Sequence, residues 1–165
     1  SRTFLEAFLR PGLGLQNWVS RSNYPTLNVV QTGPSEMSFY VNRDYGQPTA
    51  HLQRYTLRLD GFASLHAGYA GGTLLTHPLT FAGARLELNY ATSAAGAIRV
   101  EILDPAGTPI PGYTLADATE QIGDEVARQA TWKKGPDLSA LQGRPIRLRF
   151  HLKDADLYAI RFTPA

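Results

Sequence analysis

The chain has no cysteine among its 165 residues, which excludes a disulfide framework and any metal site built from thiolates. It also lacks a run of about 20 apolar residues, the length that a membrane-spanning helix needs, and it shows no signal-peptide pattern. Charged residues make up only 18% of the chain and the formal net charge is +2, too weak a basic balance to predict binding to nucleic acid. We therefore expect neither a nucleic-acid nor a membrane partner.

Turn-forming residues are plentiful: 15 glycines and 11 prolines accompany a hydrophobic content of 43%. The hydrophobic content predicts a packed core, and frequent chain reversals are typical of an all-β fold. The length fits one compact unit, with two small units as the alternative. Because the chain begins at Ser1 and not at Met, we expect a fragment of a longer protein.

The clearest periodicity lies near the C-terminal end. In residues 146–153, aliphatic and aromatic side chains alternate with arginine, histidine and lysine, a period of two that predicts a half-buried strand. The turn residues 154–156 follow, and residues 158–162 alternate again. The pattern predicts an antiparallel hairpin, with a neighbouring strand through Ala130 and Trp132.

Upstream of this hairpin, short strands recur about every ten residues from Gly61 onward, as in a β-sandwich or barrel. We expect tight turns at 93–96 and at 104–107, the second with proline and glycine at favoured turn positions. We divide the chain into residues 1–60 and 61–165. The expected sandwich core is Leu86, Leu88, Val100, Ile102, Trp132, Leu148, Phe150, Ile160 and Phe162.

The N-terminal part has a less regular pattern. Phe4 and its neighbours have helical spacing for two turns, and Trp18 is interpreted as covering a core, with an exposed sugar-stacking ring as the alternative. Three strands are expected at 27–32, 37–42 and 52–59. A sheet of this size needs a partner surface, since three strands leave much apolar area uncovered.

No pattern for nucleophilic or metal-dependent catalysis is present. There is no Gly-x-Ser-x-Gly turn, and the histidines lack metal-ligand spacing. Glycoside hydrolysis needs a pair of carboxylates, but Glu87 and Glu101 lie on outward strand positions together with arginines, a pattern typical of a solvated ladder of cross-strand charges. We predict no catalytic residues in this chain.

The loop acids form a second group to consider. Calcium prefers several hard oxygen ligands, and one loop concentrates carboxylates without matching an EF-hand pattern. A calcium site is the alternative to the prediction that the chain holds no cofactor, and its candidate ligands are Asp117, Glu120, Asp124 and Glu125.

Aromatic residues give the remaining indication of function. Sugar-binding modules stack pyranose rings on exposed aromatic faces, with flanking polar groups on the hydroxyls. The loops 43–49, 66–72 and 111–125 carry tyrosines beside polar residues or glycine, and capping of the core is the alternative role for these rings. The candidate carbohydrate-binding residues are Tyr45, Tyr69, Tyr113, Asn42, Gln47, Asp117 and Glu120.

Several segments together resemble a known family. They are Asp60-Gly61-Phe62-Ala63-Ser64-Leu65, Pro78-Leu79-Thr80-Phe81, the run from Leu86 to Ser93, Ile98-Arg99-Val100-Glu101-Ile102, Gly123-Asp124-Glu125, Trp132-Lys133, Leu148-Arg149-Phe150 and Ala155-Asp156-Leu157-Tyr158. In this order they resemble the C-terminal β-sandwich of bacterial glycosidase-like proteins, which are similar to invertase- and levanase-type hydrolases. Residues 1–60, with Phe8-Leu9-Arg10-Pro11-Gly12, Asn17-Trp18 and the run from Thr32 to Ser38, resemble the end of the five-bladed propeller that precedes such a sandwich.

The resemblance implies an all-β chain: a jelly-roll-like antiparallel β-sandwich after a short three-stranded segment similar to a propeller blade. It implies a non-catalytic module that binds a polysaccharide or oligosaccharide, or supports the catalytic propeller of a secreted or periplasmic bacterial parent. The family's catalytic carboxylates belong to earlier blades, and Glu36 matches no catalytic motif. A purely structural interdomain module and, less favoured, an enzyme in its own right stay open as alternatives.

Overall fold

The computed structural model describes residues 8–10, 12–14 and 24–165. The predicted helical turns around Phe4 and the predicted aromatic role of Trp18 fall outside these residues. In the part that is described, the chain is all-β with antiparallel sheets, and its helical content is the single 3-10 turn Ser139–Leu141. No helix of the described residues is long and apolar enough to cross a membrane.

The chain divides into two compact units, Ser1–Leu59 and Asp60–Ala165. Each unit has its own sheet, four-stranded in the first and five-stranded in the second. The boundary between them lies one residue before the division between residues 60 and 61 that the sequence analysis made.

The first unit is a sheet centred on β3 (Glu36–Arg43). Along one edge β3 pairs over its whole length with β4 (His51–Arg58). Along the other edge it pairs with two short strands, β1 (Tyr24–Pro25) and β2 (Val30–Gln31). Of the single strand expected at 27–32, only Val30–Gln31 is a strand, and Tyr24–Pro25 is a further short strand that precedes the predicted range.

The buried apolar residues of β3 lie on one face of this sheet. Met37 and Val41 are buried on β3, and between them Phe39 stacks on its cross-strand partner Tyr55 with ring centroids 5.4 Å apart. The ring of Phe8 lies 6.0 Å from that of Phe39. This aromatic group follows from the period-two alternation, which places residues 37, 39 and 41 on the same side.

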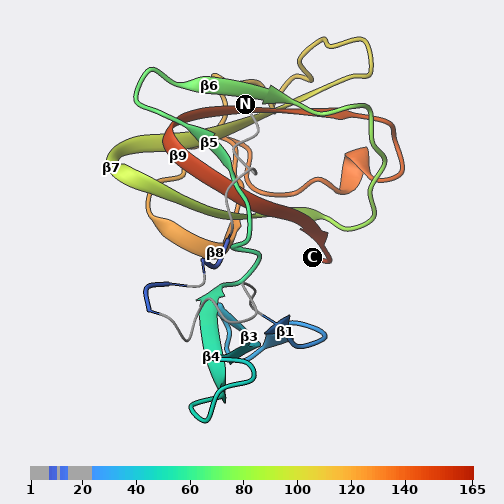
Figure 1. Ribbon diagram of the computed structural model, residues 1–165. Coiled ribbons are helices and arrows are strands. Elements are labelled where there is room, and N and C mark those ends of the chain that lie inside the picture. The colour runs from blue at the N-terminus through green and yellow to red at the C-terminus, as the bar shows by residue number, and fades with distance from the viewer. Residues whose placement is uncertain (1–7, 11, 15–23) are drawn as a thin grey trace. The chain divides into compact units, whose positions relative to one another are not determined.

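The second unit is built on two long strands that run side by side (Figure 1). β7 (Arg85–Leu103) has 19 residues and β9 (Arg147–Thr163) has 17, and they pair along nearly their full length. β8 (Asp124–Gln129) extends the sheet beyond β7. On the other side of β9 lie β5 (Leu65–Ala67) and β6 (Gly72–Leu75).

The predicted C-terminal hairpin is wrong in one respect: residues 147–163 are one continuous strand. Asp154, expected in a turn, has a left-handed backbone with φ of 43° and bends β9 without reversing it. Likewise the turn expected at 93–96 is an irregularity within β7, between Thr92 and Ala97. Both long strands bend at the same level, so one strongly curled sheet stands where the sequence predicted two separate sheets, and the unit is sandwich-like.

The bend is shared by all the strands that meet there. Opposite Asp154, β7 inserts residues 93–96, and the edge formed by β5 and β6 inserts residues 68–71. The carbonyl of Gly68 accepts hydrogen bonds from the backbone N–H groups of Gly71 and Asp154, at 2.9 and 3.0 Å. The carbonyl of Gly68 thus ties the inserted residues to β9 at the bend.

At Gly96 the backbone of β7 comes very close to the backbone of β9. A Cβ built on Gly96 would collide with the carbonyl oxygen of Asp154 and would lie 2.7 Å from that of Lys153. Because both obstacles are backbone atoms of a paired strand, neither can move away without opening the sheet. Glycine is therefore required here by space.

The core confirms most of the predicted inward positions. Seven of the nine predicted residues are buried, and the other two, Ile160 and Phe162, pack against the buried cluster. The predicted alternation of residues 158–162 puts Tyr158 on the same side as Ile160 and Phe162, but in the structure Leu157 takes the buried position. The register of β9 shifts by one residue between the partners of Asn89 and Tyr90, which reverses the sides of the side chains.

The backbone of Gly96 yields a stability prediction. We expect Gly96→Ala to lower the free energy of unfolding by about 1–3 kcal/mol, the usual cost of overpacking, or more if the bend opens. The measurement is urea denaturation of the full chain followed by circular dichroism. Gly68→Ala is the matched control: it lies at the same bend, but nothing is within 4 Å of its Cβ position, and we expect no loss. Equal effects of the two changes would contradict a steric role for Gly96.

Candidate functional site

The predicted binding residues are divided between the two units. Asn42, Tyr45 and Gln47 belong to the first. The ring of Tyr45 is partly exposed and packs on Tyr24 with centroids 4.6 Å apart. The amide of Gln47 donates only to the neighbouring carbonyl of Gly46 at 3.2 Å, and the Oδ1 atom of Asn42 is buried without a hydrogen-bond partner among the described residues.

In the second unit, the two candidate tyrosines have opposite environments. Tyr69 is 67% exposed, and the ammonium of Lys153 lies 4.3 Å from the centre of its ring. Tyr113 is 3% exposed; its ring packs edge-on against Trp132 at 5.3 Å and its hydroxyl donates to the carbonyl of Asp137 at 2.9 Å. Tyr113 therefore caps the core and offers no ring face to a ligand, which corrects its prediction as a stacking residue.

The acidic loop residues do not converge on a common point. Thr114 donates to Asp117 at 2.8 Å and, with Lys133 nearby, lowers the pKa of that carboxyl. Two further candidates are each beside an arginine: Glu120 is 3.7 Å from Arg99, and Glu125 is 3.9 Å from Arg128. In the described part of the chain no group of three or more histidine or acidic side chains is placed to hold a metal ion, so Asp117, Glu120, Asp124 and Glu125 do not form the calcium site considered above.

A row of polar side chains crosses the outer face of the second sheet. Thr73 on β6 and Arg99 on β7 are both register partners of His151 on β9. Glu120 continues the row, because Gln121 bridges to Ile98 and brings Glu120 beside Arg99. The alternation of the strands explains the row: Ile98 and Leu152 point into the core, so their neighbours point outward.

A hollow of about 420 Å³ lies over this row, next to the bend. One group of lining residues is small: Ala70, Gly71, Gly72 and Ala97. The polar group comprises Thr73, Arg99, Glu120, His151 and Lys153. The hollow exists because residues without bulky side chains stand where the sheet bends, while long polar side chains rise around them.

A buried carboxylate lies next to the row, on the same face of the sheet. The side chain of Glu101 is 6% exposed; its Oε1 atom accepts from Arg149 at 2.8 Å and lies 3.1 Å from Nε2 of His151. Burial raises the pKa of Glu101, but the hydrogen bonds and charges of His151 and Arg149 outweigh it, and the pKa is lowered. The carboxylate is thus ionised near neutral pH, and it fixes the directions of Arg149 and His151.

The sequence analysis missed this site, although it used the same residues. Arg99 and Glu101 were predicted to be members of a solvated charge ladder. The cross-strand pairs are real, with Glu101 on Arg149 and Glu87 on Arg161 at 2.7 Å, but Glu101 is buried. The sequence contains the outward polar residues and the small residues around Gly71 and Ala97 that line the hollow. Their alignment can be recognised only when the register of β6, β7 and β9 is known.

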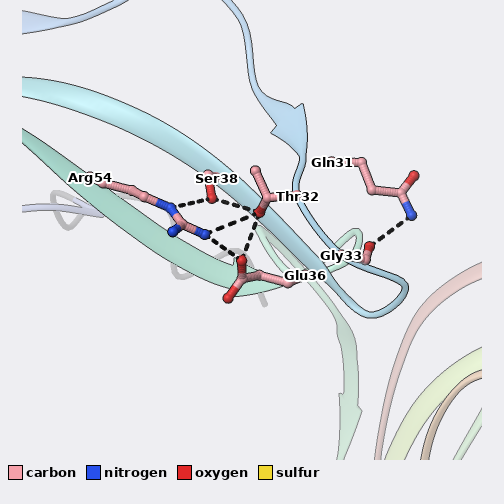
Figure 2. Close-up of polar contacts among 6 residues, drawn as sticks. All are labelled: Gln31, Thr32, Gly33, Glu36, Ser38 and Arg54. Atoms are coloured by element: carbon pink, nitrogen blue, oxygen red, sulfur yellow. Dashed lines mark hydrogen bonds and ion pairs between the residues drawn. The ribbon is translucent and has the colours of Figure 1, made fainter.

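The first unit holds a second polar cluster, in which Arg54 is central (Figure 2). Its guanidinium donates to Glu36 at 2.6 Å and to the fully buried hydroxyl of Ser38 at 2.9 Å. Thr32 donates to Glu36 at 2.7 Å. Figure 2 shows Gln31 apart from this group, on the carbonyl of Gly33. The carboxylate of Glu36 thus joins β3, β4 and the residue after β2, a structural role.

Ser64, His66 and Asp156 form a hydrogen-bonded group in the second unit, but not a nucleophilic triad. Asp156 accepts from the hydroxyl of Ser64 at 2.6 Å and contacts His66 at 3.1 Å. A nucleophilic triad needs the histidine to contact the hydroxyl, whereas here both groups contact one carboxylate oxygen. Glu120, which lines the hollow, and Glu101, which lies beside it, each face an arginine, as is typical of groups that orient side chains.

Comparison with protein-family models, with curated proteins and with solved structures gives no match to this chain. The resemblance to the sandwich of invertase- and levanase-type proteins therefore stays a prediction.

The buried carboxylate predicts a dependence of stability on pH. Because the pKa of Glu101 is below its ordinary value of 4.5, its contribution to folding is complete above that pH and is lost as the pH falls through the lowered value. At neutral pH we expect Glu101→Gln to reduce the free energy of unfolding by about 1–3 kcal/mol. The difference from the wild type should shrink in acid, as measured by denaturation at a series of pH values.

Glu120→Gln is the control for this prediction. Its carboxylate is 56% exposed and 3.7 Å from its partner, so we expect a loss below about 0.5 kcal/mol. A constant difference between Glu101→Gln and the wild type from neutral to acid pH would show that ionisation of Glu101 does not stabilise the fold.

Proposed function

We propose that the second unit is a non-catalytic carbohydrate-binding module. The observation that carries this proposal is the polar hollow at the bend of the sheet, with the exposed ring of Tyr69 against Lys153 at its side. Sugars present hydroxyls to polar side chains and apolar ring faces to aromatic rings. The hollow combines these features within the volume range of small-ligand sites.

A second hollow supports a ligand longer than one sugar. It has a volume of about 400 Å³ and adjoins the first through Glu120, which lines both. Its lining includes Arg128, Gln129 and Thr131, so hydrogen-bonding groups continue beyond the bend. A polysaccharide or oligosaccharide chain would contact both hollows, whereas a monosaccharide would occupy one.

The ancillary role in a glycoside hydrolase-like parent is part of the same proposal. It rests on the sequence resemblance, as do a jelly-roll connectivity and a bacterial secreted or periplasmic origin. The module would hold substrate near a catalytic propeller domain of the parent chain, and no residue of this chain would take part in bond cleavage.

A structural role is the second candidate, and an observation in the first unit favours it. Several large apolar side chains there are exposed, among them Leu27 at 89% and Leu52 at 60%. Exposed apolar groups that lie together mark interaction surfaces. On this alternative the chain packs on the propeller of its parent, and the polar hollow has no ligand.

The test is titration of the full chain against fructan, arabinan and xylan oligosaccharides by calorimetry. We expect dissociation constants between about 1 mM and 10 μM, or about 4–7 kcal/mol, because one stacked ring offsets only part of the entropy of association. Ala97→Phe should fill the hollow and weaken binding about tenfold or more. Tyr69→Ala should weaken it about two- to tenfold, from the loss of one aromatic contact.

Ala95→Phe is the matched control for the filled hollow. Ala95 is exposed in the same irregular part of β7 but does not line the hollow, so this variant should bind as the wild type does. Equal binding by all the variants would show that the sugar site lies outside this hollow. If no glycan binds at millimolar concentration, the structural role becomes the better explanation.

A further inference from the structure

Two cations and one carboxylate line the hollow at the bend. The cations belong to Arg99 and Lys153, and the carboxylate to Glu120. Glu101 and Arg149 lie next to the row and pair with each other, so they add little net charge. The hollow therefore has an excess of positive charge, from its arginine and its lysine.

Lys153 is the cation whose charge is least compensated. Its one interaction in the described part of the chain is with the ring of Tyr69, at 4.3 Å from the ring centre. Its register partner on β7 is Ala97, whose side chain is a methyl group and cannot pair with the ammonium. An anion in the hollow would meet this ammonium without first displacing a carboxylate.

Arg99 lines the hollow and has only a long contact with a carboxylate. Its Nε atom is 3.7 Å from Oε1 of Glu120, longer than a hydrogen bond. A guanidinium presents a planar set of donors that matches a carboxylate or sulfate group. His151 is fixed beside it by Glu101 at 3.1 Å, which leaves the second ring nitrogen for a ligand.

We infer that the ligand of this hollow carries an anionic group, a carboxylate or a sulfate, bound between Lys153 and Arg99. This inference rests on the proposed function and specifies its substrate class: an acidic glycan built of uronic acid or sulfated sugar units. The ring that carries the anion lies against Tyr69, and its neighbour along the chain extends past Glu120 toward the second hollow.

The experiment compares oligosaccharides of equal length that differ in charge. Galacturonan oligosaccharides supply carboxylates, sulfated galactan oligosaccharides supply sulfates, and neutral galactan oligosaccharides supply neither. We expect at least one acidic ligand to bind the full chain about tenfold tighter than the neutral one, with the preference reduced at high salt. The better of the two acidic ligands identifies the anion.

Lys153→Gln should weaken binding of the acidic ligand about tenfold and leave the affinity for the neutral ligand unchanged. Lys153→Arg should keep most of the preference. Lys133→Gln is the control of equal net charge, since Lys133 pairs with Asp117 at 3.7 Å and does not line the hollow. Lys153 is on the outer face of β9, and an unchanged melting temperature would verify that Lys153→Gln folds.

Three results would separate this inference from the proposed function. Equal affinity for acidic and neutral glycans, abolished by Ala97→Phe, overturns the inference and supports the sugar-binding module. Equal losses in Lys133→Gln and Lys153→Gln also overturn it, because the attraction would then be a general charge effect. Binding of inorganic sulfate or free galacturonate that needs Lys153, without binding of any oligosaccharide, supports the anion site and overturns the carbohydrate-binding module.

Discussion

The bend of β9 at Asp154 is the constraint on which the second unit depends. One strand can serve both layers of a sandwich-like unit only if its neighbours bend at the same level, and here the neighbours do so by inserting residues 68–71 and 93–96. The insertions must leave room for the backbone of β9. Gly96 provides that room on one side, and on the other the carbonyl of Gly68 pairs with the N–H of Asp154.

The candidate site is a consequence of the same bend. A Cβ on Gly71 would lie 3.2 Å from the backbone carbonyl oxygen of Leu152, and the small residues at the bend leave no bulky side chain to fill the space on the outer face. The regular strands on either side of the bend keep their alternation, so long polar side chains such as Arg99 and His151 stand around the gap. A structural requirement for small residues thus produces a polar hollow.

Local patterns in the sequence predicted the elements better than their connections. The alternation in residues 146–153 and the turn at 104–107, closed by a 3.0 Å hydrogen bond from Gly107 to Asp104, are set by nearby residues and were predicted. The continuity of β9 through Asp154 was not, because an acidic residue in a turn and one in a bend look alike in sequence. Only the pairing with β7 distinguishes them, and that pairing joins residues far apart in the chain. The hollow depends on the same long-range register, so its residues were predicted as a charge ladder.

The burial of Glu101 distinguishes its pair with Arg149 from the more exposed cross-strand pair of Glu87 with Arg161. Exposed cross-strand ion pairs add little to stability, and a buried carboxylate carries a desolvation cost that its partners must first offset. A surface ladder would place Glu101 in solvent, as Arg161 and Lys133 place their charges. Here the carboxylate is instead buried, and it contacts His151, which lines the hollow. Because Glu101 is committed to Arg149 and His151, it does not compensate the charge of Lys153, which lines the hollow.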